Sequence, residues 1–194
     1  RYAQSRIDAV DISERMLHVC RVAVPDGRVT FIHADIAEFR APCAYDLIVA
    51  NCSLHWLADL PAGFVGLADS MKPGAWLCIA VMTDGTLREL RESRLRVAPQ
   101  KRPQGSLPSA EAMRRAIRDA GLQIARAEQH TYETPYPSAQ MFLHSLRAQG
   151  LTGGAPSLSA VPLNRRELGA LVDDYTACHT RQDGMVTASF QVFF

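Results

Sequence analysis

The chain has 194 residues, which is enough for one ordinary domain with a real hydrophobic core. Hydrophobic residues make up 47% and charged residues 21%, and the formal net charge of +1 gives no overall field that would attract nucleic acid or a membrane. No apolar run reaches the roughly 20 residues that a membrane helix needs. The five cysteines are scattered without a CxxC pair. This pattern disfavours a disulfide framework or a metal site and favours a reduced, cytoplasmic setting.

Short apolar runs alternate with helical patterns, which predicts βαβ units and a mainly parallel sheet. Strands are predicted at residues 7–10, 29–34, 47–50 and 75–81. Ser13 is a predicted N-cap after the first strand. The clearest helix begins near Pro61, and apolar residues recur at helical spacing as far as Met71. Residues 72–74 (KPG) are predicted to end it, because proline cannot continue a helix and glycine can turn.

The second half predicts a helix and an exposed connection within residues 85–108. Further helices are predicted to begin at the caps Ser109, Ser138 and Asn164. A long strand is expected at 122–133, a loop at 151–163, which is rich in glycine and proline, and a closing strand at 186–194. We find no internal repeat, so the whole is predicted to be one domain.

Two of the predicted strands are followed by an aspartate. Asp11 ends the first, and Asp35 follows the second. Ligands of open α/β sheets bind at the carboxyl ends of the strands, where one acid can accept both ribose hydroxyls of an adenosine and another the adenine amino group. Ile12 and Ile36 come next in the chain and can hold the ring between them. Each aspartate taken singly is more often a cap or turn residue, but together they favour adenosine binding.

Four runs resemble the successive motifs of class I S-adenosylmethionine-dependent methyltransferases. They are residues 10–17 (VDISERML), 33–37 (HADIA), 45–51 (YDLIVAN) and 71–77 (MKPGAWL). The resemblance implies a Rossmann-like α/β sheet, mainly parallel with an antiparallel C-terminal strand, and helices on both faces. It implies S-adenosylmethionine as the cofactor and no metal. By this resemblance Asp11 holds the ribose, Asp35 holds the adenine amino group, and Asn51 lies near the methionine part.

The N-terminal part of this chain differs from the pattern of that family. The family's glycine-rich first motif lies about twenty residues before the position of Asp11. Here ten residues precede Asp11, and no GxGxG occurs. The strand carrying that motif belongs between the strand ending at Asp11 and the one ending at Ala50, so two inner edges would need partners. We expect either direct pairing of these neighbours or, as we favour, upstream residues in the natural protein. The predicted domain is therefore residues 1–194 without that strand and loop, with substrate-lid elements within 85–180.

The turn after the third predicted strand indicates which kinds of group could accept the methyl. It reads NCSLHW over residues 51–56 and lacks the Pro-Pro-aromatic turn of enzymes that methylate bases or glutamine amides. Methylation of a base amino group is therefore disfavoured. His55 can act as a general base on a hydroxyl, and with Trp56 it is a candidate substrate-binding residue. A histidine simply packed against Trp56 is the alternative.

Three later runs resemble the malonyl-acyl-carrier-protein O-methyltransferases of biotin synthesis. They are residues 85–90 (GTLREL), 145–150 (SLRAQG) and 187–192 (TASFQV). The resemblance implies methyl transfer to the free carboxylate of a malonyl group on an acyl carrier protein. A carboxylate is already a nucleophile, so the enzyme must position it and exclude water. Arg147 is predicted to hold it with a bidentate fork; the alternative is a solvated surface arginine.

An acidic carrier protein would need a basic docking surface. A basic stretch is formed by Arg88, Arg91, Arg94, Arg96, Lys101 and Arg102, followed by Arg114, Arg115 and Arg118, although a solvated helix face is its default interpretation. No nucleic-acid partner is expected, since aromatic residues are not interleaved. The alternatives left open are an O- or C-methyltransferase of a small metabolite or polyketide intermediate with His55 as base, a non-catalytic protein with this fold, and an NAD-dependent oxidoreductase.

Overall fold

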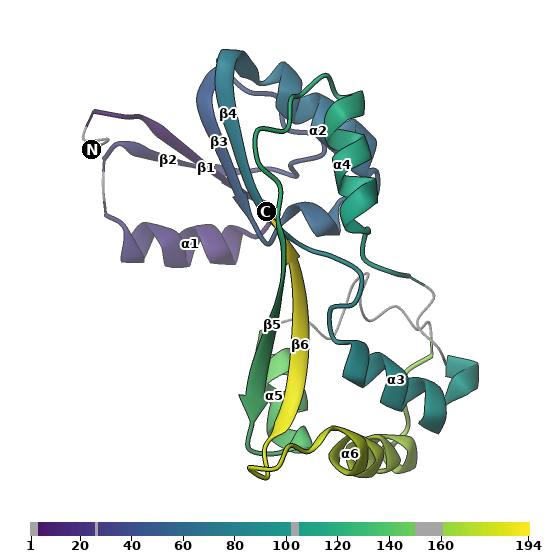
Figure 1. Ribbon diagram of the computed structural model, residues 1–194. Helices are drawn as coiled ribbons and strands as arrows, with labels where there is room; N and C mark the ends of the chain where they lie inside the picture. Colours follow the sequence, from purple (N-terminus) through teal and green to yellow (C-terminus); the bar gives the residue numbers. More distant parts are fainter. Residues whose placement is uncertain (1–3, 26, 102–104, 150–160) are drawn as a thin grey trace.

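A computed structural model describes residues 4–25, 27–101, 105–149 and 161–194 (Figure 1). The first unit consists of β1 (Ile7–Asp11), α1 (Glu14–Ala23) and β2 (Val29–His33). β1 and β2 pair in parallel. The hydroxyl oxygen of Ser13 accepts the Met16 N–H at 3.3 Å, so Ser13 caps α1 as predicted. Leu17 is buried and fixes α1 against the strand pair.

A second sheet contains four strands in the order β3-β4-β6-β5. They are β3 (Tyr45–Asn51), β4 (Met71–Met82), β6 (Val186–Phe193) and β5 (Gln129–Tyr136). β3 and β4 are parallel, whereas β6 runs antiparallel to both of its neighbours. The mainly parallel architecture with an antiparallel last strand is therefore confirmed.

Helices lie on both sides of this framework. α2 (Leu60–Asp69) and α4 (Ala110–Asp119) pack on one side of β3 and β4, and α1 lies on the other (Figure 1). The core beneath α2 and α4 includes Phe64, Met113 and Val81, none of which has any exposed surface. This packing holds the carboxyl ends of β3 and β4 rigidly.

A second layer of helices surrounds the lower half of the β5–β6 pair (Figure 1). It consists of α3 (Arg88–Val97), α5 (Ala139–Ala148) and α6 (Arg165–His179), and the short 3₁₀ turn η2 (Pro99–Lys101) follows α3. The other 3₁₀ turn, η1 (Leu54–Trp56), lies between β3 and α2. A second core joins α5, α6 and β6 through Phe142, Tyr175 and Val186. The predicted caps Ser138 and Asn164 are both present, and Asn164 forms a full capping box with Glu167.

Two predicted boundaries are wrong, each for a physical reason. α2 ends at Asp69, and residues 72–74 lie inside β4 at a register shift, where Gly74 adopts φ +79°. β5 begins only at Gln129, because its partner β6 ends at Phe193, the residue opposite Gln129. Residues 151–160 of the predicted loop lie outside the described part of the chain. Within that part, no helix is both long and apolar enough to cross a membrane.

β1 and β3 lie in separate sheets, so the described residues do not show direct pairing between these neighbours. A side-chain contact joins them instead: the Tyr45 hydroxyl group donates a hydrogen bond to Asp8 Oδ2 at 2.8 Å. Apolar side chains on one face of β3 and β4, namely Leu47, Val49 and Trp76, are exposed. Among the described residues, β1 and β3 therefore have no backbone pairing with each other, and the apolar face beside β3 is uncovered.

Candidate cofactor and acceptor site

Asp11 and Asp35 lie at the same end of the β1–β2 pair. Asp11 is the register partner of His33, and the Ala34 N–H donates to the Asp11 carbonyl oxygen at 3.2 Å. Asp35 follows two residues after His33. Both aspartates thus stand at adjacent strand ends, on the edge where α/β sheets bind their ligands.

Each of these carboxylates uses one oxygen in a local turn. Asp11 Oδ1 accepts the Ser13 N–H at 2.7 Å, and Asp35 Oδ1 accepts the Ala37 N–H at 2.9 Å. Neither Oδ2 atom has a hydrogen-bond partner among the described residues. The local bonds hold each side chain in one orientation while its second oxygen stays available as an acceptor.

Apolar surface lies beside these acceptors. Ile12 is 66% exposed, and its carbonyl oxygen is 2.9 Å from His33 Nε2, which ties it to the end of β2. Ile36 is partly buried against the main core. Free carboxylate oxygens beside isoleucine side chains fit the adenosine half of a nucleoside cofactor, which needs hydrogen-bond acceptors and an apolar surface for its ring.

Asn51 ends β3 and is exposed at the same carboxyl edge. The next residue, Cys52, has φ +51°, and its N–H donates to the Ala80 carbonyl oxygen at 2.7 Å. Such a left-handed conformation costs a non-glycine residue about 1–2 kcal/mol. Among the described residues, Leu87 is the only other non-glycine residue with a positive φ, at +55°, and it follows β4. Strained residues thus follow both neighbouring strands at one edge, a pattern typical of functional sites.

His55 is buried in the turn that follows Cys52. It is 4% exposed, and Nδ1 finds no hydrogen-bond partner among the described groups. Burial lowers the pKa of His55, so the ring is neutral near pH 7. Its centroid is 5.1 Å from that of Trp56, which is exposed. The packing contact is present, and the role of general base stays a prediction.

Arg147 lies in the last turn of α5 and is exposed. Its side chain makes no ion pair or hydrogen bond with the described residues, and no described contact brings it to Asp11 or Asn51. Its role as a carboxylate ligand stays a prediction.

Some side chains of the basic stretch form contacts within the protein and so are not available to a partner. Arg96 binds Asp174 of α6 through two nitrogens at 2.8 to 3.2 Å, and Lys101 Nζ lies 2.7 Å from Glu167 Oε2. Arg114 lies over the Phe193 ring at 4.9 Å. Arg102 lies outside the described residues. Arg96 and Lys101 therefore join α3 and η2 to α6, and the docking of a carrier protein on the remaining basic residues stays a prediction.

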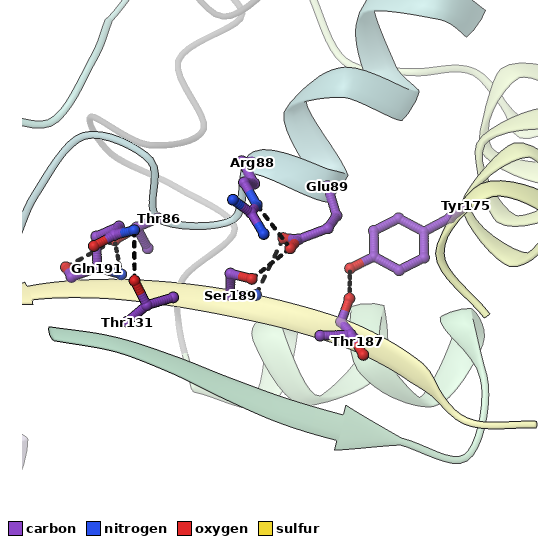
Figure 2. Close-up of polar contacts among 8 residues, drawn as sticks. All are labelled: Thr86, Arg88, Glu89, Thr131, Tyr175, Thr187, Ser189 and Gln191. Carbon is purple, nitrogen blue, oxygen red and sulfur yellow. Dashed lines mark hydrogen bonds and ion pairs between the residues drawn. The ribbon is translucent and has the colours of Figure 1, made fainter. Parts of the chain in front are cut away.

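β4 pairs only with the last residues of β6. Along the rest of that edge, the backbone of β6 forms hydrogen bonds with side chains and loop backbone instead of with a strand (Figure 2). The Thr86 hydroxyl group accepts the Gln191 N–H at 3.0 Å and donates to the Gln191 carbonyl oxygen at 3.1 Å. The Leu87 N–H donates to the Ser189 carbonyl oxygen at 2.7 Å. The Tyr175 hydroxyl group donates to the Thr187 carbonyl oxygen at 2.6 Å. This series of bonds fixes the start of α3 and the middle of α6 to β6.

Glu89 completes the series with a buried carboxylate that is 5% exposed (Figure 2). It accepts hydrogen bonds from the Ser189 hydroxyl group at 2.5 Å and the Ser189 N–H at 3.1 Å, and Arg88 Nε lies 3.2 Å away. Burial alone would raise the pKa of Glu89, but hydrogen bonds from Ser189, from its own backbone and from Arg88 bring it below the ordinary value. Sequence reasoning missed this group, although it lies in the run GTLREL that carried the family resemblance.

The chain is similar in sequence to known methyltransferases. Residues 1–77 match the family model described as a methyltransferase domain. Malonyl-[acyl-carrier protein] O-methyltransferase 2 of Ilyobacter polytropus is 23% identical over 194 residues, which are all of this chain and 74% of that protein. Trans-aconitate 2-methyltransferase of Yersinia pestis is 32% identical over 160 residues, covering 78% of this chain and 61% of that protein.

The fold has close counterparts among solved structures. A methyltransferase-like protein of Bacillus halodurans superposes with a TM-score of 0.65 at 9% identity, covering 97% of this chain and 80% of that one. This likeness concerns the fold alone. Residues 1–77 thus resemble a methyltransferase domain, and the chain shares its fold with a methyltransferase-like protein.

Proposed function

We propose that this protein transfers the methyl group of S-adenosylmethionine to a carboxylate oxygen, and that the favoured acceptor is a malonyl group on an acyl carrier protein. The observation that carries the cofactor part is the placement of Asp11 and Asp35 at adjacent strand ends, each with an Oδ2 that has no hydrogen-bond partner among the described residues. Support for the acceptor comes from the relatives. The malonyl and trans-aconitate substrates in their names have different skeletons but share a free carboxylate.

In this proposal Asp11 holds the ribose hydroxyls and Asp35 the adenine amino group. Ile12 and Ile36 contact the ring, and Asn51 lies near the methionine part. The cofactor supplies a methyl group on a positively charged sulfur, which makes that carbon electrophilic. The rigid turns at both aspartates favour binding, because no side-chain freedom remains to be lost.

The acceptor part of the proposal needs no general base. A carboxylate attacks with its own lone pair, the new O–CH₃ bond forms as the S–CH₃ bond breaks, and no proton moves. The protein must align the carboxylate and exclude water. A buried neutral His55 suits a packing or hydrogen-bonding role beside the acceptor better than proton removal.

The domain organisation is proposed as one methyltransferase domain over residues 1–194, acting in the cytoplasm, with the substrate lid within 85–180. We further propose that another strand of the natural protein lies between β1 and β3. The edges of β1 and β3 that have no backbone partner among the described residues support this, since a strand placed between them would pair with both.

A direct test measures methyl transfer from labelled S-adenosylmethionine to malonyl-acyl carrier protein. The expected product is a methyl ester, which mild base hydrolyses to volatile labelled methanol. A base-stable product would instead indicate transfer to a hydroxyl group or to carbon. No transfer to any carboxylate, despite S-adenosylhomocysteine binding, would contradict the proposal.

A free tricarboxylate is a second acceptor candidate, favoured by the 32% identity to the trans-aconitate enzyme. The same assay with trans-aconitate in place of the carrier protein separates the two. The better acceptor is the one with the higher kcat/KM.

A further inference from the structure

Arg88 and Glu89 begin α3, which follows β4 after a connection at residues 83–87 and lies beside β6 (Figures 1 and 2). Successive residues of a helix do not normally face each other. Here the Arg88 side chain nevertheless folds back, so that Nε lies 3.2 Å from Glu89 Oε1. The Arg88 side chain is 54% exposed and that of Glu89 only 7%, so the pair connects the interior to the surface.

The buried half of this pair is rigid. Glu89 is held by both the hydroxyl group and the N–H of Ser189, which has no exposed surface. Ser189 lies in the centre of β6 and is the register partner of Glu133 on β5. A buried carboxylate needs this number of donors to offset its desolvation. The position of the Arg88 guanidinium is thus set by the sheet through Ser189 and Glu89.

The exposed half of the pair is free to bind a ligand. Nε is engaged, while the two terminal nitrogens of Arg88 make no hydrogen bond or ion pair with the described residues. A guanidinium held at one nitrogen presents its outer edge as a planar fork that matches a carboxylate. Elsewhere on α3 and η2, Arg96 and Lys101 are already paired with acids of α6.

The backbone at this point also favours a placed side chain. Leu87 holds its left-handed conformation through the N–H donated to Ser189, and this conformation determines where Arg88 begins the helix. Leu87 and Cys52 follow neighbouring strands, and Cys52 adjoins Asn51. Arg88 therefore lies in the segment that follows the carboxyl end of β4, the strand that pairs with the one ending at Asn51.

We propose that Arg88 binds the acceptor carboxylate through its terminal nitrogens, and that Glu89 and Ser189 are positioning residues that orient it. This inference rests on the proposed carboxylate methylation. It assigns the carboxylate to α3 rather than to Arg147 on α5.

The test uses the full chain with S-adenosylhomocysteine present, and malonyl-pantetheine as the probe for direct binding by calorimetry. Arg88→Gln should weaken probe binding by at least about tenfold, as expected for loss of a bidentate charged contact, while S-adenosylhomocysteine affinity stays within about twofold. Arg88→Lys should not restore binding, because an ammonium group cannot form the fork. Arg166→Gln on the exposed first turn of α6 is the matched control and should change nothing.

The positioning residues are tested by the same binding measurement and by kinetics on malonyl-acyl carrier protein. Glu89→Gln and Ser189→Ala should raise KM several-fold with a smaller change in kcat, and their circular dichroism spectra should match the wild type. Arg147→Gln should leave probe affinity within about twofold of the wild type. A loss of binding that occurs in Arg147→Gln and is absent from Arg88→Gln would overturn the inference.

The outcomes separate this inference from the proposed function. If the wild type forms the methyl ester and Arg88→Gln binds and reacts normally, the inference is wrong and the proposed function stands. If the wild type binds the probe through Arg88 but forms no ester, the carboxylate site stands and the proposed reaction is wrong. If the wild type binds no carboxylate at all, both are wrong.

Discussion

The hydroxyl group of Tyr45 on β3 donates a 2.8 Å hydrogen bond to Asp8 Oδ2 on β1. Burial and this contact with Asp8 raise the pKa of Tyr45 to about 12. The bond crosses between two sheets that share no backbone pairing in the described residues. It therefore couples the unit carrying Asp11 and Asp35 to the strand carrying Asn51.

Tyr45→Phe should loosen this coupling without changing either sheet. Because one hydrogen bond to a charged group is lost, we expect about 1–3 kcal/mol of destabilisation. Hydrogen exchange should accelerate in β1 and β2 more than in β3 and β4. Uniform acceleration across all four strands would contradict this prediction. Tyr132→Phe is a suitable control, since Tyr132 is exposed on β5.

Asp11→Ala should weaken S-adenosylhomocysteine binding by about tenfold or more, because two ribose hydroxyls would lose a charged acceptor. Asp35→Ala should have a smaller effect, since a single hydrogen bond to the adenine amino group is removed. Isothermal titration measures both. Asp46→Ala is the matched control, as Asp46 is an exposed aspartate paired with Lys72. Equal affinities for the Asp11→Ala and Asp46→Ala variants would remove the ribose role.

Much of this architecture could be predicted from the sequence, because strand and helix patterns follow local periodicity. The strands with Asp11 and Asn51 and the caps Ser13, Ser138 and Asn164 depend on residues close in the chain. The start of β5 could not be predicted in this way. It depends on where a strand about sixty residues later ends, and no local pattern carries that information.

The residues of the candidate site were likewise only partly predictable from the sequence. Asp11 and Asp35 could be found because each follows an apolar run that marks a strand end. Glu89 could not, since a glutamate in a predicted helix is normally solvated. Its burial arises from Ser189, a hundred residues away, and from the early departure of β6 from β4. The strain at Cys52 and Leu87 is likewise a property of the folded chain and leaves no signal in residue type.

Glu89 should make stability depend on acid. Its folded-state pKa lies below the ordinary value of 4.5, so its contribution is fully present above that pH and is lost as pH falls through the folded value. The unfolding free energies of the wild type and Glu89→Gln, measured with urea, should therefore differ most above pH 5 and converge as the pH falls through the lowered folded-state pKa of Glu89. The Glu133→Gln variant, changed on the exposed face of β5, is the control. A constant difference across this range would show that the carboxylate charge is not what matters.

His55 provides the sharpest distinction between carboxylate and hydroxyl acceptors. Burial lowers the pKa of His55, so a reaction that used it as base would lose rate as pH falls through that lowered value. Methylation of a carboxylate requires no such base, and the acceptor stays ionised well below neutral pH. We therefore expect kcat on malonyl-acyl carrier protein to stay flat as the pH falls from neutral through the lowered His55 pKa, and His55→Asn to lower kcat by less than about tenfold with the profile unchanged. A rate that falls a hundredfold or more in His55→Asn, together with a wild-type rate that falls as pH is lowered through the His55 pKa, would favour a hydroxyl acceptor. Trp56→Phe distinguishes packing from proton transfer, because it disturbs the ring contact and leaves the imidazole in place.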